Sequence, residues 1–209
     1  TPLLATKLFV PRHRRGLVAR PRLSERLDRA VESRLALISA PAGFGKSTLL
    51  AEWLAAQPAD RPAAWLSLDA ADSQAPTFWS YVIAAIRTVA PDIGADALAR
   101  LASPQGSVDA ALATLLNDLG ALDHDLVVVL DDYHLVDAPE IAEGMAFMVD
   151  HLPPRVHLIV TSRADPALPL ARLRVRRELV EIRAADLRFT ADEAAAYLNE
   201  VMGLELGTG

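Results

Sequence analysis

The stretch from Leu35 to Thr48 constrains the fold of this chain more than any other part of it. It reads Leu-Ala-Leu-Ile-Ser-Ala-Pro-Ala-Gly-Phe-Gly-Lys-Ser-Thr, and an amphipathic segment, 49–56, follows. The apolar run 35–39 predicts a buried strand, the glycines predict a loop, and a helix is expected to begin at Lys46. Glycines let the backbone curl so that successive N–H groups face inward, and a helix start adds partial positive charge. This order of strand, loop and helix therefore predicts a cradle for phosphate groups.

The predicted loop carries the residue types that hold a nucleoside triphosphate. It matches the pattern G-x-x-x-x-G-K-[ST] except at its first position, which is Ala40. Lys46 is expected to reach the β- and γ-phosphates, and the hydroxyl of Ser47 is expected to bind Mg²⁺. The residues expected to line the nucleotide-binding loop are Ala40, Pro41, Ala42, Gly43, Phe44, Gly45, Lys46, Ser47 and Thr48. The alternative is a glycine-rich turn with an ordinary surface lysine, and the strand before the loop and the helix after it argue against that alternative.

A second element of the same chemistry is the apolar run 126–130, which leads into Asp131 and Asp132. Phosphoryl chemistry needs a carboxylate at the carboxyl end of a strand beside the phosphate loop, where it holds Mg²⁺ directly or through water. Asp131 is in that place, and Asp132 is then positioned to polarise a water molecule. Many strands end in a turn aspartate, so this pattern alone is weak evidence for a metal site. It becomes strong evidence because a phosphate loop precedes it in the chain.

A third group of candidates follows the next predicted strand, where Thr161-Ser162-Arg163 stands. Ligands of open parallel sheets bind outside the carboxyl ends of the strands, so Arg163 is expected to sense a γ-phosphate there; the alternative is an ion pair with a local carboxylate. Arg20 is expected either to lie near the nucleotide base or to be a surface residue without a role in binding. Glu52 is expected on the surface, and His134 is the only histidine near the site, with its role left open.

The whole chain alternates strands and helices, which predicts an α/β fold with a central, mostly parallel five-stranded sheet flanked by helices in three layers. The predicted strands are 35–39, 63–68, 126–130, 156–160 and 178–182. The predicted helices after the phosphate loop are 77–89, 96–101, 108–119, 139–151, 170–174 and 192–202, the last capped by Thr190. Prolines predict an extended segment over 1–23, and Ser24 is expected to cap a helix over 25–32.

The composition excludes several classes of protein. Hydrophobic residues make up 52% of the chain, which excludes a disordered protein, and the net charge of −6 argues against a general nucleic-acid surface. Two basic clusters, 12–15 and 172–177, are expected to be solvated faces. The absence of cysteine fits a cytoplasmic protein, and no signal peptide or membrane-spanning run is evident.

These motifs resemble those of the MalT-type transcriptional regulators, the large ATP-binding LuxR-type proteins within the STAND group of signal-transducing P-loop NTPases. The resembling segments include Leu17 to Leu23, Ser39 to Leu49, Trp65 to Asp69, Leu130 to Leu135, Thr161 to Arg163 and Leu187 to Thr190. The family usually has Lys-Thr-Thr where this chain has Lys-Ser-Thr, and either hydroxyl can bind Mg²⁺.

The resemblance implies a switch that binds ATP, self-associates in that state and hydrolyses ATP slowly. It implies that Asp131 is the Mg²⁺ acid, Lys46 the phosphate lysine and Arg163 the phosphate-sensing arginine. It divides the chain into an N-terminal segment 1–23, a nucleotide-binding core 24–186 and the start of a helical lid, 187–209. The family's DNA-binding helix-turn-helix is expected outside this chain.

Two other classes of protein stay open at this point. A small-molecule kinase would need an acceptor pocket and an arginine-bearing lid, for which segment 170–177 is the only hint; a stand-alone ATPase belongs with this alternative. An interaction module that has lost nucleotide binding is disfavoured because Lys46, Ser47 and Asp131 are all present.

Overall fold

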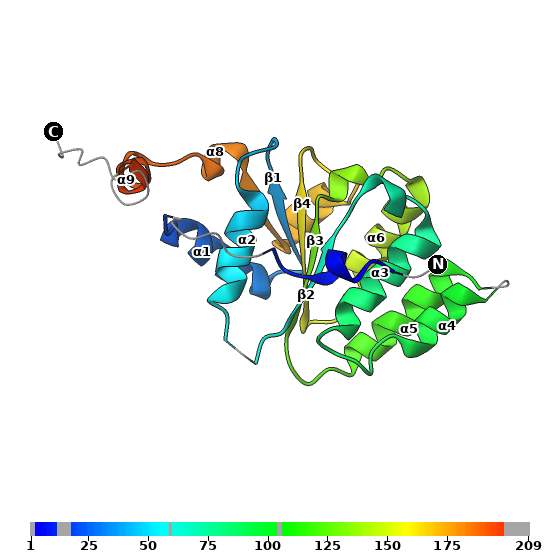
Figure 1. The fold of residues 1–209 in the computed structure, drawn as a ribbon. Helices are drawn as coiled ribbons and strands as arrows, with labels where there is room; N and C mark the ends of the chain where they lie inside the picture. Colours follow the sequence, from blue (N-terminus) through cyan, green and yellow to red (C-terminus); the bar gives the residue numbers. More distant parts are fainter. Residues whose placement is uncertain (1–2, 12–17, 59, 104–105, 199–209) are drawn as a thin grey trace.

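The computed structural model describes residues 3–11, 18–58, 60–103 and 106–198. Its centre is a five-stranded sheet with the strand order β2-β3-β4-β1-β5, in which every pairing is parallel (Figure 1). The strands are β1 (Leu35–Ser39), β2 (Ala63–Ser67), β3 (Leu126–Asp131), β4 (Val156–Ser162) and β5 (Leu179–Arg183). The predicted α/β class and the five-stranded parallel sheet are confirmed.

The three central strands are buried along their whole length, whereas β2 and β5 at the edges are partly exposed. Continuous apolar runs such as Val127–Val129 suit a strand that is covered on both faces. Side chains of a strand alternate between the faces. Accordingly Ala36 and Ile38 belong to one hydrophobic cluster, and Leu35 and Leu37 to the other.

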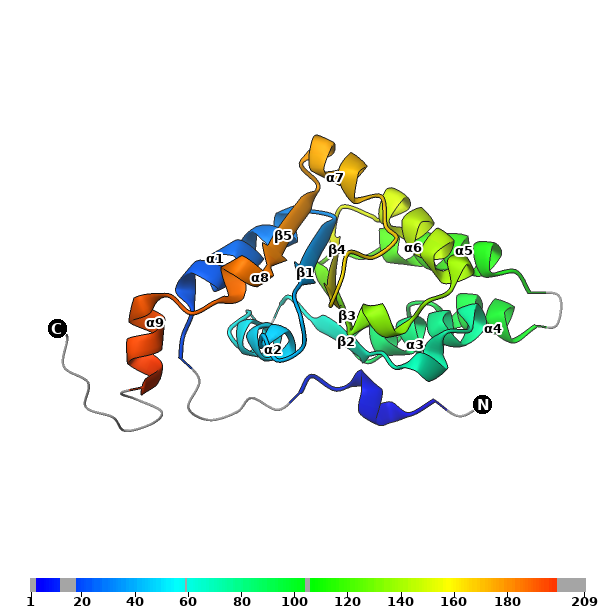
Figure 2. The same ribbon diagram turned by 90° about the horizontal axis from the view of Figure 1, so that it is seen from above.

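Helices cover both faces of the sheet, which gives the three predicted layers (Figure 2). One face carries α1 (Pro21–Asp28) and α2 (Lys46–Ala55), whose Leu27, Leu50 and Trp53 are fully buried. The other face carries the larger cluster. Its helices are α3 (Ala75–Arg87), α5 (Val108–Gly120), α6 (Pro139–His151) and α7 (Leu170–Arg176), and α4 (Ala95–Ala102) packs against α3 and α5.

The start of the first helix is a correction to the sequence prediction. Helix α1 begins at Pro21, four residues before the expected start, and Ser24 lies inside it rather than capping it. Proline is accepted at the first helical position because its missing N–H would have no intrahelical partner there. The last predicted turn is instead the 3-10 helix η2 (Arg29–Glu32).

The segment before α1 is also less extended than predicted. It contains the 3-10 helix η1 (Ala5–Leu8), drawn in dark blue beside β2 in Figures 1 and 2. Lys7 holds this turn in place, because its ammonium group lies 2.7 Å from a carboxylate oxygen of Asp69 and 2.7 Å from one of Asp72. The basic cluster 12–15 lies outside the described residues.

After β5 the chain forms two short helices, α8 (Ala184–Leu187) and α9 (Ala191–Ala196). Thr190 caps α9 as predicted: its hydroxyl accepts a hydrogen bond from the Glu193 amide at 3.2 Å, and the Glu193 carboxylate accepts one from the Thr190 amide at 3.0 Å. The rest of the predicted helix 192–202 beyond residue 198 lies outside the described residues. Within the described part, no helix has the length and apolarity that crossing a membrane requires.

Candidate functional site

The phosphate loop lies where β1 passes into α2, at the carboxyl end of the sheet. Gly43 and Gly45 have φ angles of 81° and 75°, a left-handed conformation that side chains other than hydrogen disfavour. Gly45 is the residue that precedes the first turn of α2. The parallel register puts Ser39 beside Ser162 of β4, so the loop lies next to the segment that follows β4. The predicted strand, loop and helix are therefore present in that order.

Lys46 is buried at the base of the loop, with 6% of its surface exposed. Its ammonium group donates hydrogen bonds to the carbonyl oxygens of Ala40 at 2.8 Å and Pro41 at 3.1 Å. Burial lowers the pKa of Lys46 and the nearby Arg163 lowers it further, while Asp132 and Asp131 act in the opposite direction. Neutral carbonyl groups compensate a buried cation poorly, so an anionic oxygen is the ligand that this ammonium group favours.

Asp131 lies opposite Lys46 at the end of β3 and is 5% exposed. Its Oδ1 accepts hydrogen bonds from the hydroxyls of Ser47 at 3.0 Å and Thr161 at 2.6 Å. Burial raises the pKa of Asp131, and the hydroxyl groups and Lys46 counteract that effect in part. A buried carboxylate beside a helix-start hydroxyl is the donor set that Mg²⁺ uses together with phosphate oxygens, so Ser47 and Asp131 fit the predicted metal site.

Thr161 connects the two acids; it was named in the third group of candidates from the sequence, in which a role was given to Arg163 alone. Its hydroxyl accepts a hydrogen bond from the Asp132 amide at 2.9 Å while it donates to Asp131. Asp132 has a φ of 59°, in the left-handed region, so the chain turns sharply directly after β3. Thr161 is fully buried at the end of a strand that neighbours β3, so its hydroxyl pairs with the residues that follow β3, and that neighbour relation was not evident from the sequence.

His134 lies close to these acids, with its Nδ1 3.8 Å from Oδ1 of Asp132. Both ring nitrogens are buried and have no hydrogen-bond partner among the described residues. Burial lowers the pKa of His134; Arg163 and Lys46 add to this effect, while Asp132 and Asp131 oppose it. The structure therefore puts His134 at the site, and its role stays open.

Arg163 faces the phosphate loop across a cavity of about 190 Å³ that Lys46, Ser47 and Asp132 also line. The alternative role for this arginine was an ion pair with a local carboxylate. Within the described part of the chain Arg163 has no such ion pair. Its guanidinium group is exposed and directed by no protein anion, which suits contact with a ligand.

A second cavity, of about 370 Å³, continues from the phosphate loop and shares Gly43, Gly45 and Thr48 with the first. Its other lining residues are Val18, Arg20, Phe44, Leu49, Glu52, Leu187, Arg188, Phe189 and Tyr197. Glu52, expected on the surface, is therefore partly buried in a cavity wall. The guanidinium of Arg20 lies 4.9 Å from the Phe189 ring, and its Nε is buried without a partner among the described residues.

The wall formed by 187–189 and Tyr197 was not predicted as part of the site. The chain leaves β5 next to the loop that leaves β1, because these two parallel strands are neighbours in the sheet. The strand order therefore brings this segment to the phosphate loop, and strand order was not deducible from the motifs alone.

The sequence profile of the AAA ATPase domain matches residues 17–161, which include the phosphate loop, Asp131 and Thr161. The chain belongs to this family of ATPase domains. The HTH-type transcriptional regulator MalT of Klebsiella pneumoniae is 38% identical over 198 residues, which make up 94% of this chain and 22% of that protein. The serine/threonine-protein kinase PknK of Mycobacterium tuberculosis is 40% identical over 195 residues, 91% of this chain and 17% of that protein.

Solved structures of low sequence identity share the fold of this AAA ATPase domain. A Walker-type ATPase of Pyrococcus abyssi matches with a TM-score of 0.56 at 17% identity, over 93% of this chain and 61% of that one. Cdc6p of Pyrobaculum aerophilum matches with a TM-score of 0.55 at 17% identity, over 87% of this chain and 49% of that one. The predicted P-loop NTPase fold and the similarity to MalT-type regulators are confirmed, while the chain spans less than a quarter of either curated relative.

Proposed function

We propose that this AAA ATPase domain binds ATP with Mg²⁺ and acts as the nucleotide-dependent switch of a transcriptional activator. The observation that carries the proposal is the convergence of opposite charges at one end of the sheet. A buried ammonium group and a buried carboxylate both border the phosphate loop; among the described residues the first has only carbonyl partners and the second only hydroxyl partners. A triphosphate with its metal supplies the anion that Lys46 favours and the cation that Asp131 favours.

The proposed roles follow from the side-chain chemistry. Lys46 and the loop amides bind the β- and γ-phosphates, and Ser47 and Asp131 hold Mg²⁺, which neutralises developing charge on the phosphates. Asp132 polarises the attacking water, and Arg163 contacts the γ-phosphate. The cavity beside Arg20 receives the base of ATP or ADP. Slow hydrolysis at this site would make the domain a weak ATPase whose product state resets the switch.

The proposal of a switch rests on what the two curated relatives have in common. One is a transcriptional regulator and the other a protein kinase, and each aligns with more than nine-tenths of this chain. A segment shared by proteins of such different activity supplies a common nucleotide-binding function rather than either activity as a whole. In a MalT-type protein, ATP binding would control self-association in the cytoplasm, and a helix-turn-helix outside this chain would contact DNA.

The test of nucleotide binding is isothermal calorimetry with ATP and Mg²⁺. The variant Lys46→Ala is expected to lose measurable ATP binding, and Asp131→Ala is expected to lose the part of the affinity that depends on Mg²⁺. The matched control is Arg155→Ala, which removes an exposed cation at the opposite end of β4. ATP affinity of the lysine variant equal to that of the wild-type protein would refute the assignment.

Two further measurements separate the proposed switch from its alternatives. Product analysis with labelled ATP shows whether the γ-phosphate passes to water, as expected, or to an acceptor, as for a small-molecule kinase. Size-exclusion chromatography with ADP, ATP and a non-hydrolysable analogue tests self-association. An elution volume that is the same with all three nucleotides would contradict a role for this domain in controlling assembly.

A further inference from the structure

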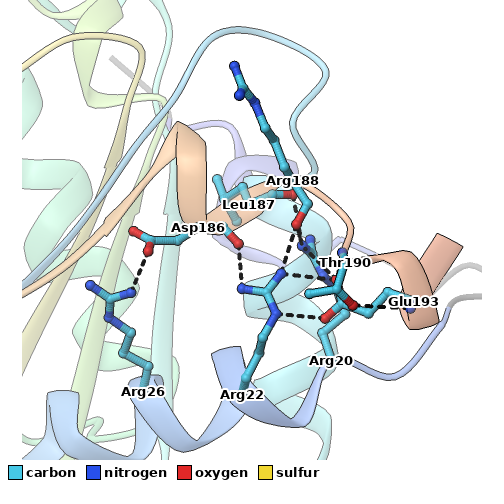
Figure 3. A network of polar contacts seen from close by, with 8 residues as sticks. All are labelled: Arg20, Arg22, Arg26, Asp186, Leu187, Arg188, Thr190 and Glu193. Carbon is cyan, nitrogen blue, oxygen red and sulfur yellow. Dashed lines mark hydrogen bonds and ion pairs between the residues drawn. The ribbon is translucent and has the colours of Figure 1, made fainter.

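The chain between β5 and α9 is attached to the first helix by a network of arginines (Figure 3). Its centre is Glu193, which is 8% exposed. The carboxylate of Glu193 accepts two hydrogen bonds from Arg22, from Nε at 2.9 Å and from a terminal nitrogen at 3.0 Å. Arg20 lies 3.5 Å from the same carboxylate. Two parallel bonds from a guanidinium fix both the distance and the orientation of a carboxylate.

The same network holds the backbone that leads to Glu193. Arg22 donates to the carbonyl oxygen of Asp186 at 2.6 Å and to that of Arg188 at 2.8 Å, and Arg20 donates to those of Leu187 at 2.8 Å and Arg188 at 3.1 Å. These partners are separated by more than 160 positions in the sequence. The segment is therefore fixed to α1 by polar contacts at successive residues.

Apolar packing contributes little to holding the α9 end of this segment. In α9 the one buried residue is Glu193 itself, and Phe189 is 50% exposed. Phe189 stacks on Tyr197 with their ring centroids 5.8 Å apart. Without the ion pair, no buried apolar side chain of α9 would hold the helix against α1, so the pair decides where α9 lies.

This segment is also one wall of the larger cavity at the nucleotide site. Leu187, Arg188, Phe189 and Tyr197 line it together with the phosphate-loop residues Gly43, Phe44, Gly45 and Thr48. The phosphate cavity, in contrast, is lined by the loop, Asp132 and Arg163, and includes none of the four wall residues 187–189 and 197. The network therefore positions the part of the site that receives the base and leaves the phosphate part untouched.

We propose that the Arg22–Glu193 pair is a latch that positions the base-binding wall, so that it sets the affinity for the nucleoside half of the ligand and not for its phosphates. Arg22 and Glu193 are positioning residues, since neither lies in the phosphate cavity. The inference rests on the proposed function, because it assigns the larger cavity to the base of ATP. When the latch is broken, α9 and the wall keep the position seen in the structure in only a fraction of the molecules. The apparent affinity for ATP is then the affinity of the intact site multiplied by that fraction.

The experiment compares two ligands, ATP and inorganic tripolyphosphate, each with Mg²⁺, by isothermal calorimetry. Glu193→Gln is expected to weaken ATP binding about tenfold, as for a protein with the wall closed in a tenth of its molecules, and to leave tripolyphosphate binding unchanged. Arg22→Gln breaks the same pair from its more exposed partner and is expected to act alike. The double variant is expected to weaken ATP binding by less than the two single effects multiplied together, because both substitutions remove the shared Arg22–Glu193 pair.

The matched control is Asp192→Asn, which removes an exposed carboxylate one position earlier in the same helix. The thermal midpoint of each variant without ligand shows that it is folded, and Arg22→Gln carries the test if Glu193→Gln does not fold. ATP affinity of the folded latch variants equal to that of the wild-type protein overturns the latch. Equal weakening of ATP and tripolyphosphate also overturns it, because the effect would then act through the phosphate loop.

Failure of the proposed function gives a different result. If the wild-type protein binds tripolyphosphate as tightly as ATP, the larger cavity does not receive a base and the latch has no role in nucleotide binding. If the wild-type protein binds neither ligand, the proposed function is wrong, and the positioning role is overturned with it.

Discussion

The hydroxyl of Thr161 is the most informative single group to remove, because it connects both acids of the site. Thr161→Val keeps the shape of the side chain and deletes that hydroxyl. The Asp131 carboxylate then loses its 2.6 Å hydrogen bond, and the buried amide of Asp132 loses its 2.9 Å acceptor. A hydrogen bond to a charged group contributes about 1.5–3 kcal/mol, and an unpaired buried amide costs about 1–3 kcal/mol. The added methyl group returns about 0.8 kcal/mol, so we expect a net loss of about 2–5 kcal/mol.

Urea denaturation of the nucleotide-free protein measures this loss as a change in the midpoint at constant slope. The control is Thr161→Ser, which keeps the hydroxyl and deletes one buried methyl group, and it is expected to lose about 1 kcal/mol. If the valine variant proves as stable as the serine variant, the hydroxyl does not hold the two acids and the reasoning is refuted.

Two further predictions concern the charge of the site and the packing of its supporting helices. Because burial raises the pKa of Asp131, the folded state loses stability as the pH rises through that pKa. Asp131→Asn should therefore be more stable than the wild-type protein at pH 7, with a gap that closes below pH 4 in urea titrations. A gap that persists in acid would contradict this. In α6 a Cβ on Gly144 would lie 2.9 Å from the ring of Trp79, so Gly144→Ala should destabilise the protein by about 1–3 kcal/mol. Gly120→Ala has open space and should stabilise it by about 0.5 kcal/mol; equal thermal midpoints for the two would disprove the packing argument.

The fold was predictable from the sequence because its strongest signals are local and independent of one another. A run such as 126–130 can be stable only where both faces are covered, and helical segments between such runs supply the cover. Chain direction in a parallel sheet then brings every strand's carboxyl end to one side, which is why Lys46, Asp131 and Arg163 could be assigned to one site.

The parts that sequence reasoning missed depend on contacts between distant segments. The start of α1 was placed late because proline was taken to exclude a helix, whereas Pro21 occupies the one position where it is favoured. The wall proposed to bind the base depends on β5 lying next to β1, and that neighbour relation is a property of the assembled sheet. Glu193 lies in the first turn of the predicted helix 192–202, and nothing local in its sequence indicates arginine partners from α1.

The pKa shifts of the two central residues have one physical cause and opposite directions. Burial lowers the pKa of Lys46 and raises that of Asp131, so it disfavours the charged form of each. Their charges compensate one another only in part, because hydrogen bonds direct Lys46 to carbonyl oxygens and Asp131 to hydroxyl groups. A ligand that brings an anion to one and a cation to the other removes both penalties at once. It follows that phosphate and metal should each bind more tightly in the presence of the other. It also follows that the two buried charges lower the stability of the nucleotide-free protein, and that nucleotide with metal raises it.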